Sequence, residues 1–471
     1  MDPASVGVGG EPERARAVGG MEYGWCRAVP GGTGTTLLAF RLARGAAKAA
    51  TVQAALESLL DAHPVLRARL RGSSSGSPTL AFPSATPPLA LELLPVPESA
   101  PDFASLLELE LNRNPWSATA SEPDADAPPV LFVTFYELPP PSSAAALFVR
   151  IHTAACDRAA SASLIRELVA SLAGDGDEAA SSSASAGEPE DAAVRAALEE
   201  RIPQRDSWKP FWARGIDMVG YSINGLRTST LPFEVTGTER STQMVRLGFD
   251  REETTRLLDA CKQNGVKLCA AMAAATLLAT RQSKQLASNQ QETYSIATLI
   301  NCRKFLEPAL DDHNVGFFHS AITNTHTIHG GEGLWELAER CQDSYTNAKN
   351  NKKHLTDISD LNFLMCRAIE NPQLTTASAL RTAIVSVFEE PAVYELSDLQ
   401  SKAGVEEFVS CATLHGVGPS IGMFDSMRDG QLDFVCMYPF PLHSRKQMQE
   451  ILNKVKQILR EGSNAHHEDC A

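Results

Sequence analysis

The same alternation of strands and helices occurs twice along the chain, and this repetition constrains the fold more than any other feature. Helical and strand-like patterns alternate in the first half, and the alternation begins again after a boundary near Thr228–Ser241. The 471 residues also exceed the roughly 250–300 at which one hydrophobic core stops growing. We therefore predict an α/β protein of two similar lobes of mixed sheet and helices, 1–227 and 242–471.

The first half contains two clear helical patterns and a pair of strands. Apolar residues in TVQAALESLLDA recur at helical spacing until Pro64 ends the pattern. Val130–Leu138 and Leu147–Ile151 predict neighbouring strands, and 164–172 predicts an amphipathic helix. The tract 174–191 has almost nothing to bury, so we expect a disordered surface loop there.

The second half begins with a strand pattern at 244–249, followed by helices at 251–263, ended by Gly265, and at 268–280. Near the end, two strand-like segments are hinged at Arg428–Gly430, and MQEILNKVKQIL predicts an amphipathic helix.

Charge and cysteine usage exclude several classes of function. A net charge of -15 opposes general attraction to nucleic acid or to anionic membranes, which leaves small molecules or proteins as expected partners. The first residues lack the apolar core of a secretory signal, and no stretch approaches the ~20 apolar residues of a membrane span, so we expect a cytosolic protein. Ten cysteines without a Cys-x-x-Cys pair predict free, mostly buried thiols and no metal site.

Four segments in a fixed order carry a family resemblance. They are DAHPVLRARL, HTAACDR, LINCRKFLEP with NVGFF, and GPSIGMFDSMRDGQLDFVCMYP. In this order they resemble the chloramphenicol acetyltransferase-like acyltransferases, a superfamily that includes plant BAHD acyltransferases and the condensation domains of peptide synthetases. The resemblance spans nearly the whole chain, although each motif is short. The Asp-Phe-Gly-Trp-Gly loop of the plant branch has no copy, and IGMFDSMRDG occupies the comparable region.

The resemblance implies two α/β lobes with a tunnel between them and a catalytic histidine at the end of a first-lobe strand. That histidine acts as a general base on an acceptor hydroxyl or amine, which attacks a thioester carbonyl. It further implies a small-molecule acceptor and acyl-CoA as co-substrate, without a permanently bound cofactor or metal. We expect a monomer with neither nucleic acid nor a membrane as partner.

The catalytic motif is altered in this chain. The family pattern is His-x-x-x-Asp-Gly, and alignment on Asp157 places Thr153 at the base position, His152 one residue earlier and Arg158 at the glycine. Since strand side chains alternate faces, this shift should turn the His152 imidazole away from the tunnel. A bulge could re-aim His152, or His313, His319 or His415 could substitute for it.

Two interpretations stay open for each candidate residue. His152 is either the catalytic base or a buried histidine bonded to the backbone, and Asp157 is either part of the site or a helix N-cap. Thr153 and His415 are expected to bind substrate, although His415 also fits a histidine at a strand end. Arg303 stands at the arginine of the family's second-lobe Asp-x-Arg motif, with Asn301 in place of the aspartate. We predict that Arg303 reaches Asp157 across the lobes, within ~4 Å.

Cys156 follows His152 by four residues, and a buried thiol is favoured over a nucleophile there.

Three candidate functions follow from these interpretations. The leading one is acyl transfer from a thioester, expected to be acyl-CoA, to a small alcohol or amine, with His152 and Asp157 as catalytic residues. The second is a catalytically silent relative that binds a metabolite or a protein. The third is condensation on a carrier-bound thioester, with the carrier acting in trans.

Overall fold

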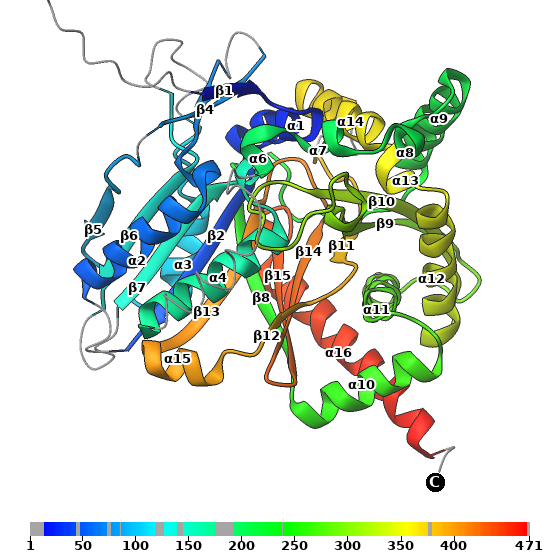
Figure 1. The fold of residues 1–471 in the computed structure, drawn as a ribbon. Coiled ribbons are helices and arrows are strands. Elements are labelled where there is room, and N and C mark those ends of the chain that lie inside the picture. Colours follow the sequence, from blue (N-terminus) through cyan, green and yellow to red (C-terminus); the bar gives the residue numbers. More distant parts are fainter. Residues whose placement is uncertain are drawn as a thin grey trace, which may run out of the picture.

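A computed structural model describes residues 14–43, 48–72, 77–84, 86–117, 127–138, 145–174, 192–237, 239–374 and 379–468. Over these residues the chain forms two sheet-bearing lobes of mixed α/β structure (Figure 1), as the sequence predicted. The surface loop expected at 174–191 lies outside the described residues, apart from Gly174. Within the described ranges, no helix combines the length and the apolar character needed to span a bilayer.

The first lobe is built on a five-stranded sheet with the order β13-β2-β7-β6-β5. Its strands are β2 (Thr33–Leu42), β5 (Leu91–Leu94), β6 (Leu131–Glu137), β7 (Ala145–His152) and β13 (Val405–Leu414). β6 and β7 pair antiparallel, which confirms the two neighbouring strands. β13 comes from the C-terminal half of the chain and pairs with β2. The division of the chain between 227 and 242 stays a prediction. β13 lies after this division in the sequence but belongs to the sheet of the first half.

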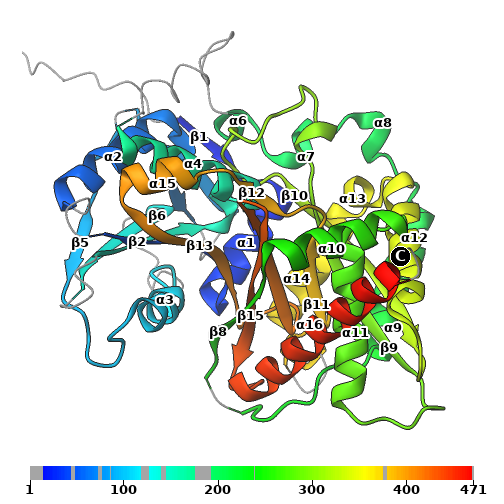
Figure 2. The same cartoon turned by 90° about the horizontal axis from the view of Figure 1, so that it is seen from below.

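Helices cover both faces of the first sheet. Figure 2 shows α2 (Ala49–Ala62), α4 (Arg158–Ala173) and α15 (Ser397–Ala403) on one face and α3 (Phe103–Asn112) on the other. α2 ends directly before His63 and Pro64, as predicted. The N-cap of α4 is Asp157, whose carboxylate accepts a hydrogen bond from the Ala160 amide, and its C-cap is Gly174, whose φ of 82° suits glycine.

Further first-half elements lie outside this sheet, and the last two of them lie against the second lobe (Figure 1). They are the small sheet of β1 (Arg14–Ala17), β4 (Thr79–Phe82) and β3 (Arg69–Arg71), and the helices α1 (Gly20–Ala28), α6 (Ala192–Arg195), α7 (Leu198–Arg201), α8 (Gln204–Ser207) and α9 (Phe211–Arg227).

The second lobe contains a seven-stranded sheet with the order β10-β9-β11-β14-β15-β8, and β12 pairs with β14 beside this path. Its strands are β8 (Ser241–Phe249), β9 (Glu292–Asn301), β10 (His319–Ile328), β11 (Val385–Phe388), β12 (Ala392–Tyr394), β14 (Ile421–Arg428) and β15 (Gln431–Phe440). The hinge predicted at Arg428–Gly430 is the β14–β15 turn, where Asp429 and Gly430 have φ of 48° and 78°.

The helices of the second lobe are α10 (Arg251–Gln263), α11 (Leu268–Ser283), α12 (Leu334–Asn350), α13 (Lys353–Thr356), α14 (Ile358–Glu370) and α16 (Arg445–Glu468). α10, α11, α12 and α16 lie together beside the sheet (Figure 1). The small residues of α11 are almost all buried, which agrees with a closely packed helix.

Strand alternation in the second sheet separates a core face from a face toward the first lobe. On β9, Tyr294 and Ile296 pack in the core with the helices, whereas Ser295, Ala297 and Leu299 line a cavity between the lobes. The second sheet therefore places every other side chain of β9 at the boundary between the lobes.

Candidate functional site

A cavity of about 600 Å³ lies between the two lobes. The first half of the chain contributes residues of α1, β2, α4 and the turn after β7, and the second half contributes β9, β10, α14 and β14. β13 also lines the cavity, with Ser410 to Leu414. The lining is mainly apolar with scattered hydroxyl groups, which is typical of a small-molecule site.

Asp157 accepts several hydrogen bonds at this boundary. Nη1 and Nη2 of Arg303 donate to its two carboxylate oxygens at 2.9 and 3.1 Å, so the predicted contact between these residues is present. The backbone N–H groups of Phe318 and Ala160 donate to the same carboxylate at 2.7 and 2.9 Å. Asp157 thus caps α4 and also joins the first lobe to the second.

His319 completes this cluster from the second lobe. It is the first residue of β10, it lines the cavity, and its Nδ1 lies 2.9 Å from Oδ2 of Asp157. Burial alone would raise the pKa of Asp157, but Arg303 and His319 hold it well below its usual range. This approach is an ion-pair contact and not a well-aligned hydrogen bond, since Nδ1 of His319 has no hydrogen-bond partner among the described residues. A carboxylate at this distance favours the tautomer with its proton on Nδ1 and Nε2 as the acceptor.

His152 lies in the interior of the first lobe. It is 1% exposed, its Nδ1 accepts a hydrogen bond from the Ala154 amide at 3.2 Å, and its ring packs edge-on against Trp116. Burial lowers the pKa of His152 to about 3. Thr153, the next residue, lines the cavity in its place. This is the reversal of faces that the shifted motif predicts, and the catalytic role of His152 stays a prediction.

The other predicted residues are spread around the cavity. The Thr153 hydroxyl lies 2.9 Å from the Thr36 hydroxyl, and both residues line the cavity. His415 does not line it: Nδ1 of His415 lies 2.8 Å from the Thr242 hydroxyl. Burial, followed by the charges of Arg381 and Arg240, lowers the pKa of His415 to about 4. The substrate-binding roles of Thr153 and His415 stay predictions.

His313, a further substitute considered from the sequence, contacts Ser163 and Glu167 with a largely exposed side chain. Cys156 is fully buried and its pKa is raised, chiefly by that burial, so the thiol reading fits better than the nucleophile. All nine described cysteines are free and buried, and the described residues contain no cluster suited to a metal ion.

Arg158, at the position of the family's glycine, lines the cavity with a largely buried side chain. Its guanidinium lies over Phe388, with 4.6 Å from Cζ to the ring centroid, and close to Phe424. It also contacts the backbone carbonyl and the carboxylate of Asp425, the latter at 3.7 Å. Burial raises the pKa of Asp425 to about 6, against the opposing effect of Arg158. The arginine thus connects α4 to the second sheet.

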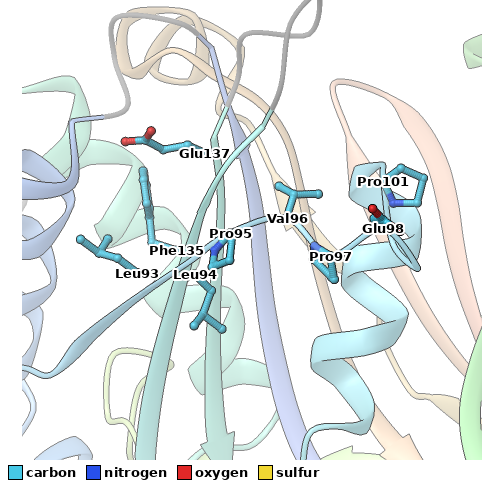
Figure 3. A pocket seen from close by; sticks show the side chains of 9 residues that line it. All are labelled: Leu93, Leu94, Pro95, Val96, Pro97, Glu98, Pro101, Phe135 and Glu137. Carbon is cyan, nitrogen blue, oxygen red and sulfur yellow. The ribbon is translucent and has the colours of Figure 1, made fainter.

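A second, shallower pocket lies at the edge strand of the first sheet. Figure 3 shows the segment Leu93–Pro101 passing beside Phe135 and Glu137 of β6. Three prolines and Leu93 form much of its wall, and its two charged lining residues are Glu98 and Glu137. It contains no histidine or cysteine and lies apart from the Asp157 cluster.

Comparisons with known proteins identify the fold of the chain. Residues 238–348 match the family model described as phthiocerol/phthiodiolone dimycocerosyl transferase C-terminus. No curated protein sequence matches the chain significantly. Similar solved structures include trichothecene 15-O-acetyltransferase of Fusarium sporotrichioides, with 12% identity, coverage of 95% of both chains and a TM-score of 0.69.

Two further structures extend the comparison. Polyketide synthase associated protein 5 of Mycobacterium tuberculosis has 14% identity and a TM-score of 0.64, over 97% of this chain and 100% of its own. The first condensation domain of the CDA synthetase has 13% identity and a TM-score of 0.61, over 97% of both chains. The chain therefore has the fold of the chloramphenicol acetyltransferase-like and condensation-domain superfamily, as its sequence predicted.

Sequence reasoning named His319 only as one of three substitutes and could not choose among them. The contact of His319 with Asp157 depends on β10 beginning beside the N-terminus of α4, which brings together residues far apart in the chain. A local signal for it is weak: small or polar residues at 321, 323 and 325 share the cavity-facing side of β10 with His319.

Proposed function

We propose that the protein is an acyltransferase in which His319, oriented by Asp157, is the general base. One observation carries the proposal: an imidazole 2.9 Å from an ionised carboxylate borders a cavity between two lobes. Asp157 is itself fixed by Arg303 and by two backbone amides, so it can hold the imidazole in one orientation. Because strand alternation turns His152 into the core, the second lobe supplies the base.

The reaction that fits this arrangement is transfer from a thioester, expected to be acyl-CoA, to an alcohol or amine. Nε2 of His319 takes the acceptor proton as the acceptor oxygen or nitrogen attacks the carbonyl carbon. The tetrahedral oxyanion collapses, the C–S bond breaks, and the leaving thiolate takes the proton from the imidazolium. Arg158 lies over Phe388, a ring that His319 also contacts, and its cationic charge would favour the oxyanion.

The direct test is thiol release from acetyl-CoA and longer acyl-CoA thioesters, across a panel of alcohol and amine acceptors. Turnover that requires both donor and acceptor supports the proposal. If no pair gives turnover above the rate without protein, the acyl-CoA form of the proposal is overturned. A phosphopantetheine thioester on a carrier protein, tested in the same way, separates the condensation alternative from it.

A catalytically silent binding protein is the second candidate, and Thr153 favours it. This residue occupies the family's base position and cannot act as a base near neutral pH. In that case the cavity binds a metabolite without chemistry. Calorimetric binding of coenzyme A or of an acceptor, together with absence of turnover for every pair, would favour the binder over the enzyme.

A further inference from the structure

Two aromatic pairs lead away from His319 along the wall of the cavity, toward different elements. Phe317, two residues before His319, packs edge-on against Trp25 of α1, with 5.5 Å between the ring centroids. The ring centroid of Phe388 lies 6.2 Å from that of His319 and 5.4 Å from that of Phe424 on β14. All five side chains line the cavity. A substrate group at His319 can therefore extend toward α1 or toward β14.

The two directions differ in charge. Toward β14, the Arg158 guanidinium lies 4.6 Å from the Phe388 ring centroid and 3.7 Å from the Asp425 carboxylate, so this wall contains a buried ionic pair. Toward α1, the cavity-lining residues of α1 and β2 that the structure describes include no charged side chain. An apolar chain that keeps water from a buried charge adds to the cost of its desolvation. Such a chain is therefore more stable on the α1 side.

Helix α14 continues the uncharged wall. α1 and α14 lie side by side (Figure 1), and the methyl end of Met365 packs against Gly24, where a Cβ atom would overlap it. Arg367, a charged cavity residue of α14, is exposed to solvent. With Phe317, the apolar side chains of the two helices form what we call the α1–α14 arm of the cavity. From the helices it contains Met21, Trp25, Ile358, Leu361, Leu364 and Met365.

The indole of Trp25 is held in place from two directions. Gly34 of β2 has a φ of 95°, and a Cβ atom there would lie 2.6 Å from Cε3 of Trp25, so the ring lies directly against the glycine backbone. Phe317 packs on the ring from the second half of the chain. A fixed aromatic ring stops a chain at a defined depth, whereas a flexible methionine adapts to it.

We propose that the α1–α14 arm binds an apolar chain of a substrate and that Trp25 sets the length of chain accepted. The chain would extend from the group at His319 past Phe317 to the indole. It belongs to the acyl group of the donor or to an alkyl acceptor, since both present the same methylene groups to this wall. The kinetic consequences rest on the acyl transfer proposed above, but binding of the chain does not require turnover.

The kinetic test varies one chain at a time. One series uses acyl-CoA thioesters of increasing length with a fixed productive acceptor, and the other uses acetyl-CoA with alcohols of increasing length. In the series whose chain occupies the arm, kcat/KM should rise about threefold to fourfold per added methylene and fall once the chain reaches Trp25. Trp25→Ala should move this optimum to longer chains, and Trp25→Phe should move it less.

The matched control is Phe424→Leu, which changes an aromatic residue of the other wall. It should keep the chain-length optimum of the series that Trp25→Ala shifts. A shift in the acyl-CoA series assigns the chain to the donor, and a shift in the alcohol series assigns it to the acceptor.

A binding test separates the arm from the reaction. Trp208→Phe/Trp212→Phe removes two exposed indoles, and this variant is titrated with a fatty acid brominated at its terminal carbon, because bromine quenches an indole that it contacts. We expect partial, saturable quenching of tryptophan emission. Adding Trp25→Phe to the same background should abolish that quenching. Quenching without turnover for any donor and acceptor keeps the arm and overturns acyl transfer.

Turnover with the same chain-length optimum in Trp25→Ala as in the wild type, in both series, overturns the proposal and leaves acyl transfer in place. Quenching that persists with Trp25→Phe also overturns it, because the chain would then lie elsewhere. Absence of both turnover and quenching overturns both proposals. If circular dichroism shows that Trp25→Ala is unfolded, Trp25→Phe, which keeps an aromatic ring against Gly34 and Phe317, decides the question.

Discussion

His152 and His319 both stand at the end of a strand near Asp157, and their surroundings are opposite. His152 closes β7 inside the first lobe, bonded to the backbone at Ala154 and packed on Trp116. His319 opens β10 at the lobe boundary, with Nδ1 beside the carboxylate of Asp157. The comparison teaches that distance along the sequence does not decide which imidazole lies beside the Asp157 carboxylate.

The reason is the period of a strand. A shift of one residue exchanges core and cavity faces, so His152 becomes a core residue and Thr153 faces the cavity. The Asp157–Arg303 contact does not depend on that alternation, because Asp157 is the N-cap of α4 and lies beyond the strand. A histidine from β10 can therefore use the same carboxylate.

Among the changes that test this difference between the two histidines, removal of His319 should have the largest effect. We expect His319→Gln to lower the rate of acyl transfer by about 10²–10⁴-fold, which is the usual contribution of a general base. The measurement is the initial rate of thiol release with a productive donor and acceptor. His326→Gln, a buried histidine on the same strand that does not line the cavity, should keep the rate. An unaffected His319→Gln enzyme would remove His319 from the mechanism.

Removing the partner of Asp157 tests the carboxylate itself. Arg303→Met leaves a buried carboxylate without its guanidinium, and we expect a loss of about 3–5 kcal/mol in the free energy of unfolding. Chemical denaturation measures it. The double variant Asp157→Asn/Arg303→Met removes the uncompensated charge and should recover part of the loss. A single variant as stable as the wild type would show that the two residues do not form the pair described here.

The burial of His152 should be detectable in the pH dependence of the free energy of unfolding. Its pKa is about 3 in the folded protein and about 6.5 in an unfolded chain, so the unfolded state binds the proton first as pH falls. The stability from this neutral histidine is complete above pH 6.5 and is lost as pH falls toward 3, by about 2 kcal/mol between pH 7 and pH 5. Between pH 7 and pH 5, the free energy of unfolding should fall by about 2 kcal/mol less for His152→Gln than for the wild type, as measured by denaturation curves. Equal losses would mean that His152 is accessible to protons.

The smallest effect is expected at the family's base position. Thr153→Val removes a hydroxyl that contacts Thr36, which costs about 1 kcal/mol of stability. Since His319 supplies the base in our proposal, the rate of acyl transfer should change by less than roughly fivefold. Kinetics at saturating donor measure this. A loss as large as that of His319→Gln would place proton transfer at the Thr153 side of the cavity.

Much of the fold is local and could be predicted from the sequence. Helix α10 has the predicted bounds, Pro64 follows the end of α2, and β6 and β7 are neighbours because each pattern is set by nearby residues. Asp157 and Arg303 were paired through the motif. The position of His319 could not be predicted, because it depends on how the start of β10 meets the N-terminus of α4. The exposure of Trp212, Ile216 and Val219 on α9 could not be predicted either, since periodicity gives a face but not its direction.

The strand β13 has a consequence for how the protein is made. The first sheet takes this edge strand from residues translated long after β2, so the ribosome must add most of the chain before the sheet can close. At ~5–20 residues per second, the edge of β2 waits unpaired for tens of seconds. An unpaired edge of this kind invites pairing with other nascent chains. A fragment ending before residue 238 would keep that open edge permanently, so the N-terminal half is expected to need its C-terminal half, supplied in cis or co-expressed, to remain unaggregated.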